Sequence, residues 1–332
     1  MSVLGDKFDA LFLDLDGTLY RGADVVPGAV EVLADCSASL WYVTNNASRS
    51  PAQVAHHLDE LGFVATEDTV VTSSQAAARV LADLVDPGST VLVVGTDALA
   101  AEIEKVGLVP VRSAEPTPAA VVQGHSPTTA WPILAEATYA LRAGAVWVAA
   151  NTDTTLPSER GFGPGNGAMV AALRAATDLE PIVAGKPAEP LMRDSLERSG
   201  SRSPLVVGDR LDTDIEGANA ITVPSLLVLT GVSQPLDVLR AVPEQRPTYI
   251  ASELSALLRA EDDSIVRATD DWSATVKGDT LVVKYNGSEA VSYDTSTAAL
   301  RAVAPLAWAA GRFSEVAGDG SVASAVVEQW MR

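Results

Sequence analysis

Ala10-Leu-Phe-Leu-Asp14-Leu-Asp16-Gly17-Thr18 is the stretch that decides the fold of this chain of 332 residues. Its apolar start has the length of a strand, and an unbroken apolar run is typical of a strand buried on both faces of a parallel sheet. Asp14 and Asp16 follow at the carboxyl end of this strand, where open α/β sheets bind ligands. Two carboxylates this close repel each other unless a cation lies between them or one is protonated. The stretch therefore predicts metal-assisted acid–base chemistry at a sheet edge, with an acidic structural turn as the alternative.

Apolar runs of strand length alternate with segments of helical periodicity on both sides of this stretch. Such alternation is typical of an α/β fold with a parallel sheet. The segment 152–167 is rich in Pro, Gly and Thr, and it predicts a long loop. Strands are predicted at 10–14, 41–44, 70–72, 90–94, 119–123, 145–150, 181–184, 205–207 and 225–229, and helices at 27–40, 51–61, 74–85, 97–106, 129–142, 168–177 and 191–198.

The sequence changes character after about residue 260. Two apolar runs, 274–277 and 280–284, are separated by Gly278-Asp279, and this two-residue spacing predicts a β-hairpin. Helices are predicted at 298–310 and 322–330. We therefore expect a doubly wound parallel-sheet core from residues 1–88 and 183–260, a second α/β block at 89–182, and a small accessory α+β module at 261–332.

The charge balance restricts the partners of the chain. The formal net charge is −20 and the pI is about 4.4, so polyanionic nucleic acid and anionic membrane surfaces are not expected partners. A small anionic substrate stays compatible, because a metal ion and a few donors reverse the potential locally. The start has no basic segment followed by an apolar one, and no stretch reaches about 18 uncharged apolar residues, so a cytoplasmic protein is expected. The single Cys36 excludes disulfide and cysteine-rich zinc sites, and it is predicted to be a buried, unreactive thiol.

Three further polar positions follow predicted strands or short apolar runs. Thr44-Asn45-Asn46 offers a hydroxyl and exposed backbone N–H groups, although such a triplet alone also fits a helix-capping turn. Lys186 lies between Gly and Pro, where a solvated surface lysine is the simpler reading of the residue by itself. Asp209 and Asp214 follow the apolar run 205–207, and their carboxylates suit a hard cation such as Mg²⁺, with a structural turn as the alternative.

Taken together, these positions resemble the four signature motifs of the haloacid dehalogenase-type (HAD) phosphatases. These motifs are Asp-x-Asp-Gly-Thr, a strand-terminal Thr, a Lys, and Gly-Asp-x-x-x-x-Asp, and both their order and approximate spacing match over residues 7 to about 255. The block at 89–182 looks like the α/β cap of the NagD-like, p-nitrophenylphosphatase-like branch. Local strings agree with that branch: Val43-Thr-Asn-Asn-Ala-Ser48, Asn151-Thr-Asp153, Pro164-Gly-Asn-Gly-Ala168 and Ala184-Gly-Lys-Pro-Ala188. The resemblance implies a HAD-like core with an inserted cap.

The resemblance also implies a mechanism. Asp14 would attack phosphorus and form an aspartyl-phosphate, while Asp16 would protonate the leaving alcohol and later deprotonate the hydrolytic water. The implied cofactor is Mg²⁺, held by the Asp14 carboxylate, the Asp16 backbone carbonyl and Asp209, with Asp214 in the outer shell. The phosphate- and substrate-binding group implied by the resemblance consists of Thr44, Asn45 (through its backbone), Asn46 and Lys186.

The substrate is the least determined part of the prediction. The fit to the family looks closest to phosphatases of glycerol 3-phosphate and phosphoglycolate, so a small phosphomonoester is expected and glycerol 3-phosphate is preferred, with segment 151–167 as the candidate selector. In the cap, Gly124-His125-Ser126 departs from the family, which usually has an Asp there. Phosphoglycolate, pyridoxal phosphate or a nucleotide are alternative substrates, and a phosphotransferase or mutase, or a non-catalytic metabolite-binding regulator, are alternative functions. A homo-oligomer through the cap or the C-terminal module is left open.

Overall fold

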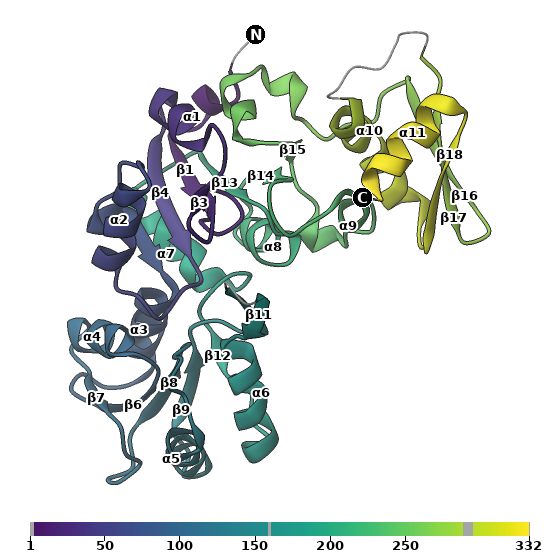
Figure 1. Ribbon diagram of the computed structural model, residues 1–332. Helices are drawn as coiled ribbons and strands as arrows, with labels where there is room; N and C mark the ends of the chain where they lie inside the picture. The colour runs from purple at the N-terminus through teal and green to yellow at the C-terminus, as the bar shows by residue number, and fades with distance from the viewer. Residues whose placement is uncertain (1–2, 159–160, 288–294, 332) are drawn as a thin grey trace. The chain divides into compact units, whose positions relative to one another are not determined.

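The computed structural model describes residues 3–158, 161–287 and 295–331 (Figure 1). Its contacts divide the chain into two compact units, residues 1–40 with 202–332 and residues 41–201. The largest sheet in each unit is parallel, as expected for an α/β fold. Among the described residues, no helix has the length and apolar character needed to cross a membrane.

The first unit contains four parallel strands in the order β15-β14-β13-β1. All four residues of β1 are buried, as the unbroken apolar run predicted. The strands of this sheet are β1 (Ala10–Leu13), β13 (Pro204–Gly208), β14 (Ser225–Val228) and β15 (Tyr249–Ala251), and the α- and π-helical segments up to residue 260 are α1 (Ala29–Asp35), a π-helical turn (Leu211–Ile215), α8 (Glu216–Ala220) and α9 (Pro235–Leu239).

The C-terminal part of the first unit is a three-stranded sheet with two helices (Figure 1). The predicted hairpin is confirmed, and Gly278 turns it with a φ of +65°, which glycine adopts without steric cost. A third strand that the sequence did not predict, β18, pairs with β17 in parallel. The elements are β16 (Trp272–Lys277), β17 (Thr280–Tyr285), α10 (Thr295–Ala310), β18 (Glu315–Asp319) and α11 (Ser321–Trp330).

The C-terminal part shares a hydrophobic core with the preceding residues of its unit. Helix α10 packs against α9 and β15, and Leu239 and Ile250 belong to the same buried cluster as Leu300 and Val303. The Trp308 indole N–H donates a hydrogen bond to the Val238 carbonyl oxygen at 2.8 Å. The module is therefore packed into the first unit rather than tethered to it.

The second unit contains the pair β4–β5 and a five-stranded parallel sheet in the order β12-β9-β8-β6-β7. The strands of these sheets are β4 (Ser39–Thr44), β5 (Val70–Thr72), β6 (Thr90–Val94), β7 (Val109–Val111), β8 (Ala120–Gln123), β9 (Val146–Ala149) and β12 (Ile182–Val183), and the helices are α2 (Pro51–Glu60), α3 (Ser73–Leu84), α4 (Asp97–Lys105), α5 (Trp131–Arg142), α6 (Asn166–Thr177) and α7 (Glu189–Ser199). The division into core, cap and accessory module stays a prediction.

Two predicted segments were wrong. The helix predicted at 27–40 is only α1, because the chain leaves the helix at Cys36 and residues 39 and 40 already belong to β4. The loop predicted at 152–167 instead contains the antiparallel hairpin of β10 (Thr155–Ser158) and β11 (Gly161–Pro164), and α6 already begins at Asn166. Two of its glycines serve close packing, because a Cβ at Gly165 would clash with the Asp153 carbonyl oxygen and a Cβ at Gly167 with the Thr152 carbonyl oxygen.

Candidate active site

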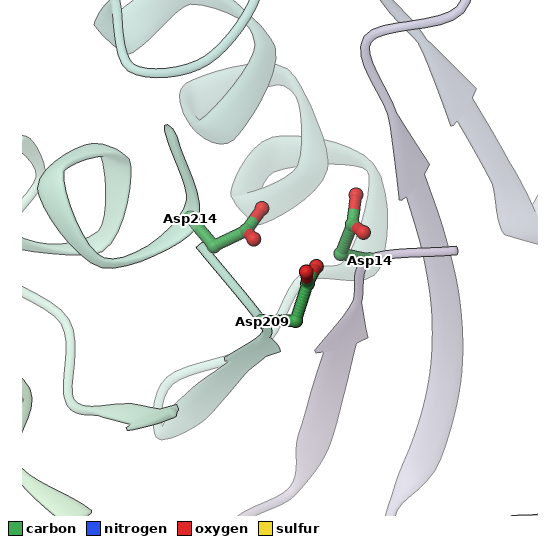
Figure 2. A group of neighbouring side chains, drawn as sticks. All are labelled: Asp14, Asp209 and Asp214. Atoms are coloured by element: carbon green, nitrogen blue, oxygen red, sulfur yellow. The ribbon is translucent and has the colours of Figure 1, made fainter. Parts of the chain in front are cut away.

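Three carboxylates meet at the carboxyl ends of neighbouring strands in the first unit (Figure 2). Asp14 follows β1 and Asp209 follows β13, and the parallel register that pairs Leu13 with Val207 brings these two strand ends side by side. Asp214 reaches them from the π-helical turn after β13. One oxygen atom from each of the three carboxylates lies within 4.8 Å of the other two. The structure thus brings together three of the predicted metal-site residues.

The path of the chain around Asp214 depends on Gly208. The Asp214 carboxylate accepts a hydrogen bond from the Arg210 backbone N–H at 3.1 Å, which closes the turn. A Cβ atom at Gly208 would overlap the Asp214 carboxylate, so only glycine permits this approach. Asp214 is 1% exposed, which means that the strand end and the turn enclose it almost completely.

The Asp209 carboxylate is enclosed by two glycines and a backbone donor. Its Oδ2 accepts a hydrogen bond from the Val232 N–H at 2.6 Å, and Cβ atoms at Gly17 or Gly231 would overlap the carboxylate. Gly17 also has a φ of +87°, so both its conformation and its contact require glycine. The role of Gly231 was not predicted from the sequence, although this glycine follows shortly after the predicted strand 225–229.

Asp16 lies in the tight loop that follows Asp14, and its side chain is exposed. Gly17 N–H donates to the Tyr20 carbonyl oxygen at 2.8 Å, and the chain then forms the short hairpin of β2 (Tyr20–Arg21) and β3 (Asp24–Val25). The Asp16 carboxylate is not part of the three-carboxylate cluster. Its exposure and its place beside Asp14 in the sequence suit a proton-transferring role, which stays a prediction.

Thr44, Asn45 and Lys186 come together in the second unit. Lys186 is 2% exposed and its ammonium donates to the Val43 carbonyl oxygen at 3.0 Å, so the alternative of a solvated surface lysine is wrong. The Asn45 side chain bonds both backbone groups of Lys186, accepting from its N–H at 2.8 Å and donating to its carbonyl oxygen at 3.0 Å. The residue after β4 and the third residue after β12 are therefore fixed relative to each other within this unit.

The remaining residue of the predicted triplet forms a local turn. The Asn46 Oδ1 accepts from the Ser48 N–H at 2.8 Å and from the Ser48 hydroxyl at 2.9 Å, while the Asn46 N–H donates to the Thr44 hydroxyl at 3.1 Å. The N-cap of α2 is Ser50, whose hydroxyl accepts from the Gln53 N–H. The triplet therefore precedes the helix without capping it, contrary to the alternative considered from the sequence.

The carboxylate cluster fits a divalent cation bound by oxygen. Two of its members, Asp209 and Asp214, are buried, and buried charges of one sign are unfavourable without a compensating cation. Carboxylate oxygens are the ligands that Mg²⁺ and Ca²⁺ prefer, whereas a thiol or imidazole would indicate a softer metal. Among the described residues, this is the one group of three or more acidic, His or Cys side chains with metal-binding geometry.

Cys36, His56 and His125 are not members of the carboxylate cluster. Burial raises the pKa of the Cys36 thiol to about 11, so this thiol is protonated and unreactive at neutral pH, although the side chain is only half-buried. Burial lowers the pKa of His125 below its usual 6.5, which keeps this imidazole neutral at pH 7. His56 is exposed and lies near Glu60 on α2, as a surface residue does.

Comparison with known proteins identifies the family. Residues 11–109 match the haloacid dehalogenase-like hydrolases, and residues 183–257 match a second family of HAD-hydrolase-like domains. The chain is 51% identical over 312 residues to the D-glycerol 3-phosphate phosphatase of Mycobacterium tuberculosis, covering 93% of this chain and 88% of the relative. It is 34% identical to the acid sugar phosphatase of Staphylococcus saprophyticus, covering 76% of this chain and 98% of the relative.

Solved structures give the same result. The crystal structure of the M. tuberculosis glycerol phosphate phosphatase in complex with magnesium superposes with a TM-score of 0.94 at 49% identity, over 99% of both chains. The p-nitrophenyl phosphatase from Archaeoglobus fulgidus superposes with a TM-score of 0.69 at 28% identity, over 76% of this chain and 98% of that one. The predicted family is confirmed: this chain belongs to the phosphatases of the haloacid dehalogenase-like hydrolase family.

Proposed function

We propose that this phosphatase is a Mg²⁺-dependent hydrolase of small phosphate monoesters and that its substrate is glycerol 3-phosphate. The observation that carries the proposal is the cluster of Asp14, Asp209 and Asp214 at the ends of β1 and β13. The substrate is supported by the D-glycerol 3-phosphate phosphatase relative, whose similarity extends over 93% of the chain.

The proposed chemistry divides between two carboxylates. A carboxylate oxygen of Asp14 attacks phosphorus and forms an aspartyl-phosphate, while the bond to the glycerol oxygen breaks and Asp16 gives that oxygen a proton. Asp16 then takes a proton from the water that attacks the aspartyl-phosphate, which releases phosphate and restores Asp14. Mg²⁺, when held by Asp14, Asp209 and the Asp16 backbone carbonyl with Asp214 behind them, supplies neutralisation of the charge on the transferring group.

The second group of residues is proposed to bind the phosphate oxygens. Lys186 provides a compact positive charge, and Thr44, the Asn45 backbone N–H and Asn46 provide hydrogen-bond donors. The support is that Lys186 is buried and that its backbone N–H and carbonyl oxygen are both hydrogen-bonded. These contacts fix the position of its backbone, as expected for a residue whose charge must lie at one place. In the proposed division, the cap at 89–182 selects the leaving group and the module at 261–332 is accessory.

The test is a panel of phosphomonoesters assayed with and without Mg²⁺ on the wild type and on Asp14→Asn. The panel contains glycerol 3-phosphate, phosphoglycolate, pyridoxal phosphate, a nucleotide and a sugar phosphate. We expect glycerol 3-phosphate to give the highest kcat/KM, and activity to require Mg²⁺. Asp14→Asn should lower kcat by about 10³-fold or more, because an amide cannot form the covalent intermediate. Wild-type turnover by this variant would contradict the mechanism, and transfer of phosphate to a second alcohol would indicate a phosphotransferase.

A further inference from the structure

We propose that Asp153 is a positioning residue for Lys186 and that it acts through the side-chain amide of Asn45. The inference rests on the proposed function, in which Lys186 binds the phosphate group. All three residues lie in the second unit, and the contacts that connect them are hydrogen bonds within that unit.

The first step is that one side chain holds the backbone of Lys186. Asn45 Oδ1 accepts from the Lys186 N–H at 2.8 Å, and Asn45 Nδ2 donates to the Lys186 carbonyl oxygen at 3.0 Å. Both polar backbone groups of the lysine are thereby bound to a single amide. Gly185 permits this approach, because its Cβ would lie 2.6 Å from Asn45 Oδ1.

The second step is that Asp153 determines which way the amide faces. Asn45 Nδ2 lies 3.3 Å from both carboxylate oxygens of Asp153. A carboxylate only accepts hydrogen bonds, so it favours the orientation with Nδ2 towards Asp153 and Oδ1 towards the Lys186 N–H. In the opposite orientation the amide oxygen would face the carboxylate, and the amide nitrogen would face an N–H group. Asp153 therefore stabilises the one orientation that satisfies Lys186.

The third step is that both ends of this connection are fixed. The Asn45 carbonyl oxygen accepts from the Ser73 hydroxyl and from Asn151 Nδ2, each at 2.6 Å. The Asp153 N–H donates to Asn151 Oδ1 at 3.2 Å. The Lys186 side chain is almost fully buried, so a displacement of its backbone moves its ammonium group as well. The position of the charge thus depends on residues 151–153, which lead directly into the β10–β11 hairpin.

The experiment is a swap of the two interacting groups. Asn45→Asp places two carboxylates face to face and removes the donor to the Lys186 carbonyl, so kcat/KM should fall by about 30-fold or more. Asp153→Asn keeps an acceptor oxygen and should lower kcat/KM by only about threefold. In the double variant, the amide introduced at position 153 donates to the carboxylate introduced at position 45. This variant should be at least about fivefold faster than Asn45→Asp alone, the sign of a direct interaction.

Two binding measurements distinguish positioning from a general loss of structure. The inhibition constant of inorganic phosphate should rise in Asn45→Asp, while the half-saturating Mg²⁺ concentration stays at its wild-type value, because the metal-site carboxylates are other residues. Asp178→Asn, which removes an exposed carboxylate at the end of α6, is the matched control and should change neither value. Circular dichroism and thermal unfolding establish that each variant is folded.

Several outcomes would overturn the positioning role. One is a double variant as slow as Asn45→Asp, and another is an equal change in the phosphate and Mg²⁺ affinities of Asn45→Asp. If Asn45→Asp does not fold, the role is overturned by wild-type phosphate inhibition in both folded Asp153→Asn and folded Asp153→Ala. Lys186→Met separates this failure from failure of the proposed function. Wild-type phosphate affinity in folded Lys186→Met would reject Lys186 as the phosphate-binding residue. If Lys186→Met weakens phosphate binding but Asp153→Asn does not rescue Asn45→Asp, only the role of Asp153 is rejected.

Discussion

Gly208 shows how one position without a side chain determines the geometry of the metal site. The residue is the last of β13 and directly precedes Asp209, and a Cβ there would overlap the Asp214 carboxylate. The same restriction applies at Gly17 and Gly231, whose Cβ atoms would overlap Asp209. Three glycines from three parts of the sequence thus leave the space that two buried carboxylates occupy.

We expect Gly208→Ala to weaken Mg²⁺ activation. The added Cβ displaces Asp214 from the cluster, so the half-saturating Mg²⁺ concentration should rise by about tenfold or more, as for loss of a supporting group at a metal site. The control is Gly95→Ala, whose Cβ would meet the flexible end of the Leu99 side chain at 2.8 Å and should leave Mg²⁺ activation unchanged. Mg²⁺ titrations of activity measure both variants, and equal curves for Gly208→Ala and the wild type would show that Asp214 does not support the metal.

The sequence predicted the proposed catalytic and metal-binding residues better than the residues that hold them in position. Asp14 and Asp209 follow apolar runs, so their place at strand ends could be predicted from a local pattern. Gly231 follows a predicted strand, but its contact with Asp209 and the contacts of the Asn45 side chain join residues that are distant in the sequence. Lys186 was identified through the family resemblance, since a lysine between Gly and Pro is by itself compatible with solvent exposure.

At the scale of elements, long periodic segments were predicted well and short ones were missed. The strands β7 and β15 have three residues each, too few to establish a period, and β18 contains Gly318, which weakens a strand pattern. The hairpin of β10 and β11 was missed because its Gly and Pro residues are typical of loops, yet a two-stranded ribbon tolerates both. These short elements are stabilised by contacts with segments that are distant in the sequence, so a local pattern does not reveal them.

Helix α10 carries Pro305 in its interior, and this residue allows a prediction about stability. Proline cannot donate the helical hydrogen bond from its nitrogen and it crowds the preceding turn. Pro305→Ala should therefore raise the free energy of unfolding by about 1–2 kcal/mol, after allowance for the greater freedom of the unfolded variant chain. Denaturant unfolding measures the change, and kcat should be unaffected. A lower stability would mean that the surrounding residues have adapted to the proline.

At the scale of the molecule, the module at 261–332 belongs to the first unit and shares its hydrophobic core. The accessory role that the sequence predicts for it stays a prediction, and its helices complete a core that includes Ile250 of β15 and Leu239 of α9. Trp308 makes two contacts at this boundary: its indole N–H donates to the Val238 carbonyl oxygen, and its ring lies 5.1 Å from the Arg246 guanidinium carbon. The polar and aromatic contacts at this boundary resemble those inside a domain.

We therefore expect Trp308→Ala to lower the stability of the phosphatase without altering its chemistry. Loss of the ring and its hydrogen bond should reduce the free energy of unfolding by about 2–4 kcal/mol. Trp308→Phe, which keeps the apolar ring and loses the hydrogen bond, should cost about 1 kcal/mol. Denaturant unfolding and kcat with saturating Mg²⁺ measure the effects of both substitutions.

A chain ending at residue 260 should be poorly soluble, because it exposes Leu239 and Ile250. If that truncated chain kept the wild-type stability and rate, the module would fold independently of the unit against which it packs.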